Sequence, residues 1–253
     1  MKAFITGASS GIGAEFAKQL AKRKYDLVLL GRNKKKLDSL AKFFKEKYFV
    51  SCEIICADFS IEEDIDRARK FLGNEDIDLL INNAGFGLNS EFMDSTLKEN
   101  LSMMKVHNEA TVIFTYVVLK KMLQKKRGCI INVASIAGWL PARKNALYSS
   151  TKIFLINFSK ALSVEVRNKG IIIQALCPGL TYTGFHSTDK YNGFKKSIVP
   201  RLFWMKSEEV VQKSLNALEK GKVVYIPGIF NKLIVFFGKR GIVFRLLFHF
   251  MKY

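Results

Sequence analysis

The chain has 253 residues, 49% of them hydrophobic, which is enough for one substantial domain with a large core. No linker rich in Pro, Gly or Ser divides it, so a single domain is expected. The formal net charge of +19 would suit a polyanionic partner, but the lysines and arginines are spread over nearly every predicted helix, without an aromatic-basic recognition module. This pattern favours solvated helix faces and argues against nucleic-acid binding.

The four cysteines have no C-x-x-C spacing and the chain has only three histidines, which argues against a zinc site. Reduced thiols in apolar runs are typical of a cytoplasmic protein; they are Cys52, Cys56, Cys129 and Cys177. The first predicted strand starts at Lys2 and leaves no room for a signal peptide. We therefore expect a cytoplasmic protein without a metal.

The N-terminal stretch predicts a strand, a tight turn and a helix. Residues 2–6 are rich in β-formers, residues 7–13 are a cluster of glycines and serines, and residues 14–23 form an amphipathic pattern. Glycines let the backbone approach a ligand closely, and a helix N-terminus offers N–H groups and the positive end of its dipole. The turn is therefore predicted to bind the pyrophosphate of a nucleotide.

The spacing of this turn is Gly7-x-x-x-Gly11-x-Gly13 after Thr6, not the usual G-x-G-x-x-G. It resembles the classical branch of the short-chain dehydrogenase/reductase family, and the resemblance extends over about residues 2–228. It implies an α/β fold with a doubly wound, mainly parallel, seven-stranded sheet and helices on both faces. It also implies cofactor contacts from Gly7, Ser9, Ser10, Gly11, Ile12 and Gly13.

The second predicted strand, residues 26–31, ends at Arg32 without an acidic residue, and Lys34, Lys35 and Lys36 follow. In dinucleotide-binding units an acid near this point takes the ribose 2′-OH of NAD, whereas arginine accommodates the 2′-phosphate of NADP. The sequence therefore predicts NADP(H), with Arg32 as the main phosphate contact. The alternative is that these cations simply begin the solvated helix predicted over residues 34–48.

The next two strands also end in candidate binding residues. Residues 53–57 lead to Asp58, which in the family bonds the adenine, and Ser60 is a candidate N-cap for a helix over residues 61–72. Residues 77–81 lead to Asn82-Asn83-Ala84-Gly85, the family's own tetrapeptide, at a place that suits the ligand crevice of a parallel sheet. The resemblance implies cofactor contacts from Asn83, Ala84 and Gly85.

Residues 100–126 are predicted to form a long helix, and here the sequence departs from the family. The position that carries a catalytic-site asparagine in the family falls on His107, with Asn108 one residue later. One residue is about 100° around a helix, so Asn108 could take that place only with a local bulge. Two interpretations stay open. Either His107 takes over the water-holding role in the proton relay, or the register slips by one residue.

The catalytic candidates follow the strand predicted over residues 128–134. Ser135 lies at its carboxyl end, and Tyr148 and Lys152 lie four residues apart on one face of the next helix. A phenol with its ordinary pKa of about 10 is a poor acid at neutral pH, but an adjacent ammonium lowers the pKa. Tyr148 could then protonate a substrate alkoxide, with Ser135 orienting the substrate oxygen. The resemblance adds contacts from Tyr148 and Lys152 to the nicotinamide ribose.

The strand predicted over residues 171–177 ends at a Pro-Gly turn that in the family covers the nicotinamide. The resemblance implies contacts from Pro178, Gly179, Thr181 and Thr183. Residues 185–206 mix glycine, proline and aromatics without clear periodicity, and we interpret them as a substrate lid. A helix over residues 207–220 and a seventh strand over residues 223–226 complete the domain, which is expected to end at about residue 228.

Residues 229–253 are a cationic and apolar extension, predicted to form two short helices broken at Gly238-Lys239-Arg240-Gly241. Neither apolar run approaches the roughly 18 residues that a spanning helix needs. The helices could lie on an anionic membrane, which would put the protein at the inner face of that membrane. Alternatively, they could pack over the substrate pocket or against another subunit.

These patterns predict an NADPH-dependent carbonyl reductase or alcohol dehydrogenase that needs no metal. Residues 134–139 and 227–233 look like bacterial uncharacterised reductases related to 3-oxoacyl reductases, which suggests a lipophilic or acyl-type small-molecule substrate. The resemblance also implies a homo-oligomer. The alternative function is an NADP(H)-sensing or membrane-docked binding protein with the same fold and little turnover.

Overall fold

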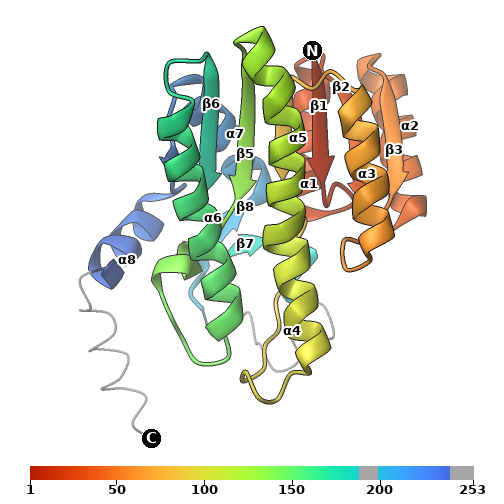
Figure 1. Ribbon diagram of the computed structural model, residues 1–253. Coiled ribbons are helices and arrows are strands. Elements are labelled where there is room, and N and C mark those ends of the chain that lie inside the picture. Colours follow the sequence, from red (N-terminus) through yellow and green to blue (C-terminus); the bar gives the residue numbers. More distant parts are fainter. Residues whose placement is uncertain (188–198, 240–253) are drawn as a thin grey trace, which may run out of the picture.

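A seven-stranded parallel sheet forms the centre of the computed structural model, which describes residues 1–187 and 199–239 (Figure 1). The strand order is β3-β2-β1-β4-β5-β6-β9, and every neighbouring pair is parallel. This confirms the predicted doubly wound sheet. The strands are β1 (Lys2–Thr6), β2 (Asp26–Gly31), β3 (Cys52–Cys56), β4 (Leu79–Asn82), β5 (Gly128–Val133), β6 (Ile171–Leu176) and β9 (Val224–Tyr225).

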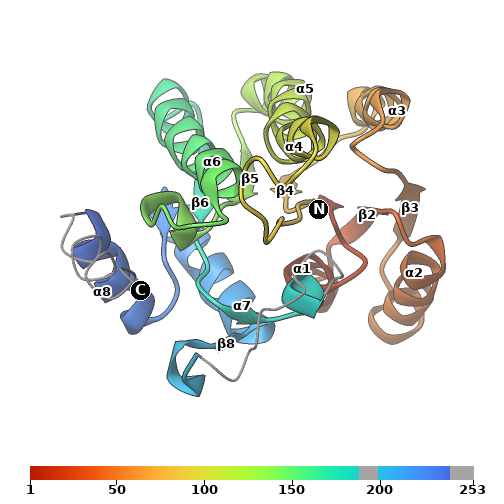
Figure 2. The same ribbon diagram turned by 90° about the horizontal axis from the view of Figure 1, so that it is seen from below.

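Helices cover both faces of this sheet (Figure 2). One face carries α1 (Gly11–Lys22), α2 (Lys34–Tyr48) and α7 (Ser207–Glu219), and the other carries α3 (Glu62–Asn74), α4 (Leu97–Met104), α5 (Ala110–Lys125) and α6 (Ala146–Glu165). Alternate strand residues therefore pack on opposite faces of the sheet. Phe4 packs edge-on against Phe114 of α5, whereas Ile5 belongs to the core beneath α1. Burial on both faces explains why the strands are almost continuously apolar.

The strand order reverses at β1, which lies between β2 and β4. The chain leaves β1 for α1 on one face of the sheet and reaches α4 on the other face after β4. The two connections therefore diverge at the carboxyl ends of these strands, and it is in the crevice at such a point that open α/β sheets bind their ligands.

Two local predictions were wrong or incomplete. Ile61, not Ser60, is the N-cap of α3, because Ile61 still has extended backbone angles (φ −104°, ψ 126°) and the helix begins only at Glu62. The long helix predicted over residues 100–126 is interrupted by a π-helical segment, η1 (Lys105–Glu109), in which the Ala110 N–H bonds to the Lys105 carbonyl. The extra residue in this turn is the kind of bulge that often marks functional sites.

A second small sheet, which the sequence did not predict, closes the base of the predicted lid. Strands β7 (Thr181–Tyr182) and β8 (Met205–Lys206) pair in parallel and are flanked by short 3-10 turns at Gly184–Ser187 and Arg201–Phe203. Tyr182 stacks on Trp204 with ring centroids 5.0 Å apart. Residues 188–198 of the predicted lid lie outside the described residues.

The C-terminal extension begins with helix α8 (Ile229–Lys239), which packs back on the domain. Asn231 and Val235 are buried, and a Cβ on Gly238 would lie 2.3 Å from Leu140 Cδ2. The second predicted helix falls at residues 240–253, outside the described part of the chain. No helix within residues 1–187 and 199–239 has the length and apolarity to cross a membrane.

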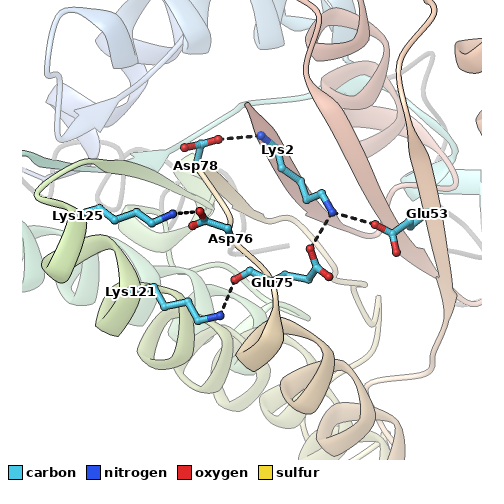
Figure 3. A network of polar contacts seen from close by, with 7 residues as sticks. All are labelled: Lys2, Glu53, Glu75, Asp76, Asp78, Lys121 and Lys125. Carbon is cyan, nitrogen blue, oxygen red and sulfur yellow. Dashed lines mark hydrogen bonds and ion pairs between the residues drawn. The ribbon is translucent and has the colours of Figure 1, made fainter.

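A network of charged groups ties the sheet together at the amino ends of its strands (Figure 3). The Lys2 ammonium bonds to Glu53 at 2.9 Å and Glu75 at 2.7 Å, joining β1 to β3 and to the end of α3. Burial lowers the pKa of Lys2, but the two carboxylates outweigh it and leave the pKa above its usual value. The whole network comprises Lys2, Glu53, Glu75, Asp76, Asp78, Lys121 and Lys125. The edge opposite the crevice is therefore held by ion pairs.

Candidate active site

The Thr6 hydroxyl joins the two loops that border the crevice. It accepts hydrogen bonds from the backbone N–H groups of Asn83 at 2.8 Å and Ala84 at 2.9 Å, and it donates to the Ile81 carbonyl at 3.3 Å. The Asn83 amide in turn donates to the carbonyls of Thr6 and Gly7. Because Thr6 is only 2% exposed, water cannot replace these bonds.

The glycine turn after β1 has the shape of a cradle for a dinucleotide. Gly7 and Gly11 adopt φ values of +65° and +57°, which favour glycine. A Cβ on Gly13 would lie 2.3 Å from the Gly7 carbonyl oxygen, so only glycine lets α1 start this close to the turn. The N-cap of α1 is Ser10, whose side chain makes no capping bond. The N-terminus of α1 therefore faces the glycine turn, and the free N–H groups of a helix N-terminus are suited to bind an anion.

The ends of β2 and β3 bring Arg32 and Asp58 together. Their side chains approach to 3.7 Å, and the Arg32 side chain is 72% exposed. Burial raises the pKa of Asp58, but hydrogen bonds from Ser60 and the charge of Arg32 outweigh it, so the pKa lies below its usual value. Ser9 reaches the same region, because a Cβ on Gly31 would lie 3.2 Å from Ser9 Oγ. A charged pair therefore borders one end of the crevice.

Tyr148 and Lys152 lie in the first two turns of α6, with the Lys152 ammonium 5.5 Å from the centroid of the phenol ring. The ammonium also donates to the Val133 carbonyl at 3.0 Å. Burial lowers the pKa of Lys152 to about 8, partly opposed by the neighbouring Cys177. A lysine with this pKa remains largely protonated at neutral pH, and its charge favours ionisation of the phenol.

Ser135 follows β5 and is the N-cap of a 3-10 turn, η2 (Ile136–Trp139). Its hydroxyl accepts from the Ala137 N–H at 3.1 Å and donates to the Pro178 carbonyl at 3.4 Å. The turn packs closely on α6, since a Cβ on Gly138 would lie 2.9 Å from the Ile153 backbone nitrogen. Ser135 is thereby fixed relative to the helix that carries Tyr148.

A buried polar chain beneath the site was missed by the sequence analysis. Asn82 at the end of β4 donates to Asn132 of β5 at 2.9 Å, and Asn132 donates to the Ser159 hydroxyl of α6 at 2.9 Å. Asn82 also reaches the Thr115 hydroxyl of α5 at 3.2 Å. An asparagine inside the otherwise apolar residues 128–133 is the signal that could have revealed it, since a buried amide requires partners.

His107 lies in η1, is 1% exposed, and faces both the loop after β4 and α6. Its Nε2 accepts from the Phe86 N–H and its Nδ1 lies near the Thr151 hydroxyl, both at 2.9 Å. Asn108 donates to the Thr151 carbonyl at 3.1 Å. The π-helical segment directs both side chains toward α6. It is the local bulge that Asn108 would need to reach the position expected for the asparagine.

The segment after β6 closes the crevice from the other side. Thr181 donates to the Gly179 carbonyl at 3.0 Å, and a Cβ on Gly11 would lie 3.2 Å from Thr183. The ring of Phe185 lies 5.9 Å from that of Tyr148. Helix α8 supports the Pro178-Gly179 turn, because a Cβ on Gly179 would lie 2.2 Å from Asn231 Oδ1. The role of Asn231 could not be inferred from the sequence, since it depends on how α8 packs.

The predicted site residues thus gather along the carboxyl edge of the sheet, with Ile12 partly buried against the core beneath α1. Within the described ranges, no group of three or more His, Cys, Asp or Glu side chains could hold a metal ion.

The whole N-terminal part of the chain, residues 1–192, matches the family model described as short chain dehydrogenase. The chain belongs to this family. The very-long-chain 3-oxoacyl-CoA reductase of Anas platyrhynchos is 38% identical to it over 184 residues, 70% of this chain, and the reductase-B of Danio rerio is 35% identical over 201 residues, 77% of this chain. The matched regions span only 58% and 62% of those two relatives.

A solved family structure agrees over almost the whole chain. The short-chain dehydrogenase from Sphingobium yanoikuyae in complex with NADPH is 29% identical, with a TM-score of 0.85, and the match covers 96% of this chain and 95% of that one. The fold of this chain is therefore that of the family.

Replacing Thr6 by Val keeps the side-chain shape but leaves the N–H groups of Asn83 and Ala84 without their acceptor. Each unsatisfied buried donor costs about 1–3 kcal/mol, so the free energy of unfolding should fall by roughly 2–4 kcal/mol. Urea denaturation followed by circular dichroism measures the loss. Thr6→Ser keeps the hydroxyl and should lose much less; an equal loss in both variants would contradict the role of the hydroxyl.

Proposed function

We propose that this protein is an NADPH-dependent oxidoreductase that moves a hydride between nicotinamide and a carbonyl or secondary alcohol. The observation that carries the proposal is the buried Lys152 ammonium beside the Tyr148 phenol, close to the loop after β4 that also contacts the glycine turn. When bound, the cofactor supplies or accepts the hydride. The side chains of this protein bind the cofactor, orient the substrate and transfer the proton.

The residues along the crevice suit NADP(H). The glycine turn and the N-terminus of α1 would hold the pyrophosphate, and Asp58 would contact the adenine. Arg32 is largely exposed beside Asp58 and would take the 2′-phosphate. The residues after β4 and β6 would border the nicotinamide; they are Asn83, Ala84, Gly85, Pro178, Gly179, Thr181 and Thr183. The family member from Sphingobium yanoikuyae, which was solved with NADPH, supports the same choice.

Tyr148 would protonate the substrate oxygen during reduction and remove the hydroxyl proton in the reverse direction. The Lys152 cation makes this possible at neutral pH because it favours the phenolate. Ser135 would hydrogen-bond the same substrate oxygen and hold it near the phenol. Each of these groups acts on the oxygen that gains or loses the proton.

The substrate is proposed to be lipophilic or acyl-type. The relatives named very-long-chain 3-oxoacyl-CoA reductase support this class. Beside Tyr148, four apolar side chains line a small hollow whose other lining residues are mostly polar; they are Leu88, Phe92, Met103 and Leu147. Two aromatic rings, Phe203 and Phe230, pack edge-on at 5.9 Å between the lid and α8.

Peripheral contact with an anionic membrane through the C-terminal segment is part of the proposal. The outer face of α8 exposes five apolar side chains, with Lys232 beside them. A helix with this face suits the interface of a membrane that carries negative lipids. The exposed side chains are Ile229, Phe230, Leu233, Phe236 and Phe237. Such contact would place the protein at the inner face of a membrane and bring it close to lipophilic substrates.

Homo-oligomerisation is proposed through α4 and α5. Apolar side chains recur along the exposed side of these two helices, and a large exposed apolar surface is typical of an interaction site. They are Leu97, Leu101, Met104, Val112 and Tyr116. A second copy of the chain would cover them.

Replacing Tyr148 by Phe should lower the rate of NADPH oxidation at least about 100-fold, because general acid catalysis contributes that much or more. The assay uses purified protein with a panel of ketones, aldehydes and 3-oxoacyl thioesters. NADPH binding should persist in the variant and serves as the control. A wild-type protein that binds NADPH tightly but reduces none of the panel would favour the alternative, an NADP(H)-sensing or membrane-docked binding protein.

Replacing Arg32 by Ala should weaken NADPH binding by about 10- to 100-fold, since a hydrogen bond to a charged group contributes about 1.5–3 kcal/mol. NADH binding should not change, because NADH lacks the 2′-phosphate. Fluorescence titration measures both. Lys42→Ala, which removes an exposed cation on α2, is the control. Equal affinity of the wild type for NADH and NADPH would refute the assignment.

Replacing both Phe236 and Phe237 by Ser should reduce partitioning onto vesicles of phosphatidylcholine and phosphatidylserine by at least about tenfold, because each buried ring contributes about 1.5–3 kcal/mol. Sedimentation with vesicles measures the effect. Phe49→Ser removes an equally apolar side chain at the end of α2 and should have no effect. Unchanged binding after loss of both rings would exclude α8 as the membrane contact.

Introducing charge at Leu101 and Tyr116, as Leu101→Glu and Tyr116→Glu, should convert an oligomer to a monomer because glutamate is costly to bury in an apolar interface. Light scattering on the eluting protein gives the mass. Phe49→Glu is the matched control. A monomeric wild type would contradict the proposed interface.

A further inference from the structure

A chain of hydrogen bonds runs through the ring of His107 from the loop after β4 to the first turn of α6. The backbone N–H of Phe86 donates to His107 Nε2 at 2.9 Å. The other ring nitrogen, Nδ1, lies 2.9 Å from the Thr151 hydroxyl oxygen. That hydroxyl donates to the backbone carbonyl of Tyr148 at 2.8 Å. This series of hydrogen bonds therefore ends at Tyr148, the residue that carries the phenol.

The backbone donor determines the direction of every bond in this chain. A backbone N–H can only donate, so Nε2 must be an unprotonated acceptor and the ring must be neutral. The single ring N–H is then on Nδ1, which donates a hydrogen bond to the Thr151 hydroxyl oxygen. That hydroxyl in turn donates to the backbone carbonyl of Tyr148. Both nitrogens of His107 are thus bonded to protein groups.

The surroundings of the ring support the neutral form. His107 is 1% exposed, and the titratable groups that face it in the described chain are Lys152 and Tyr148, whose ring centroid lies 5.8 Å away. Burial, and to a smaller extent the positive charge of Lys152, hold the pKa of His107 well below its ordinary value. Gly85 lets the ring approach the loop, since a Cβ there would lie 2.9 Å from Nε2.

We propose that His107 is a positioning residue, held in its Nδ1-protonated tautomer, which fixes Tyr148 relative to the loop after β4 and exchanges no proton in the reaction. This inference rests on the proposed function of Tyr148 as the proton donor. It assigns His107 a task different from the water-holding role in the proton relay. Asn108 adds a second link from the same π-helical turn to the Thr151 carbonyl.

Nitrogen-15 NMR of protein labelled at its histidines tests the tautomer without any turnover. The chain has only three histidines, and His107→Gln identifies the signal of His107. The signal should show a protonated Nδ1 and an unprotonated Nε2, and it should not titrate near the ordinary histidine pKa of about 6.5. A proton on Nε2, or a titration near that pH, would overturn the proposal.

Thr151→Val tests the positioning, because it removes the hydroxyl while keeping the shape of the side chain. The kcat should fall on the order of 10- to 100-fold, as expected for a small misplacement of a catalytic group. The NADPH affinity and the midpoint of the pH dependence of kcat should not change. Thr151→Ser keeps the hydroxyl and should restore kcat. An unchanged kcat in Thr151→Val would overturn the proposal.

His107→Gln separates positioning from proton transfer. Its amide oxygen can still accept from the Phe86 N–H, but the bond to Thr151 is lost, so kcat should fall without any shift in the pH midpoint. A displaced midpoint would show that His107 exchanges protons and would overturn the proposal. Failure of the proposed reaction gives a different result, because it would silence the wild-type protein while leaving the NMR signature of His107 intact.

Discussion

The arrangement of the site depends on one buried hydroxyl, that of Thr6. At the point where the strand order reverses, the loops after β1 and β4 leave the sheet toward opposite faces, and no ladder of sheet hydrogen bonds holds them together. The Thr6 hydroxyl bridges them by accepting two backbone N–H groups and donating to a carbonyl. These hydrogen bonds are needed because the backbone N–H groups of the loop after β4 would otherwise lack partners.

The amino ends and the carboxyl ends of the parallel strands are stabilised in different ways. The amino-end edge carries surface ion pairs around Lys2, which join several elements but need no special geometry. The carboxyl edge carries buried polar groups, among them Lys152 and His107, whose partners are fixed by distance and direction. A buried charge or imidazole is costly unless it is hydrogen-bonded, so each of these side chains is held by protein partners where the proposed chemistry takes place.

Helix α8 connects the least typical part of the chain to the site. Its buried side holds Asn231 against the turn of Gly179, and its exposed side is apolar. The same helix would thus support the turn that is proposed to border the nicotinamide, and it would also meet a lipid surface. A lipophilic substrate is consistent with both halves of this arrangement, because it would be concentrated at that surface.

The sequence by itself determined the sheet, the glycine turn and the pairing of Tyr148 with Lys152. The individual strands and the Tyr148–Lys152 pair follow from apolar periodicity and from spacing along one helix, which are local properties of the chain, whereas the order of the sheet was implied by the family resemblance. The sequence could not reveal the partners of His107, the contact of Asn231 with Gly179, or the small sheet of β7 and β8. It also misassigned Ser60 as a helix cap, because Ile61 keeps an extended backbone and α3 begins one residue later than expected. The contacts of His107 and Asn231 join residues far apart in sequence, 44 positions in the case of His107 and Thr151, so only the packing of whole elements decides them.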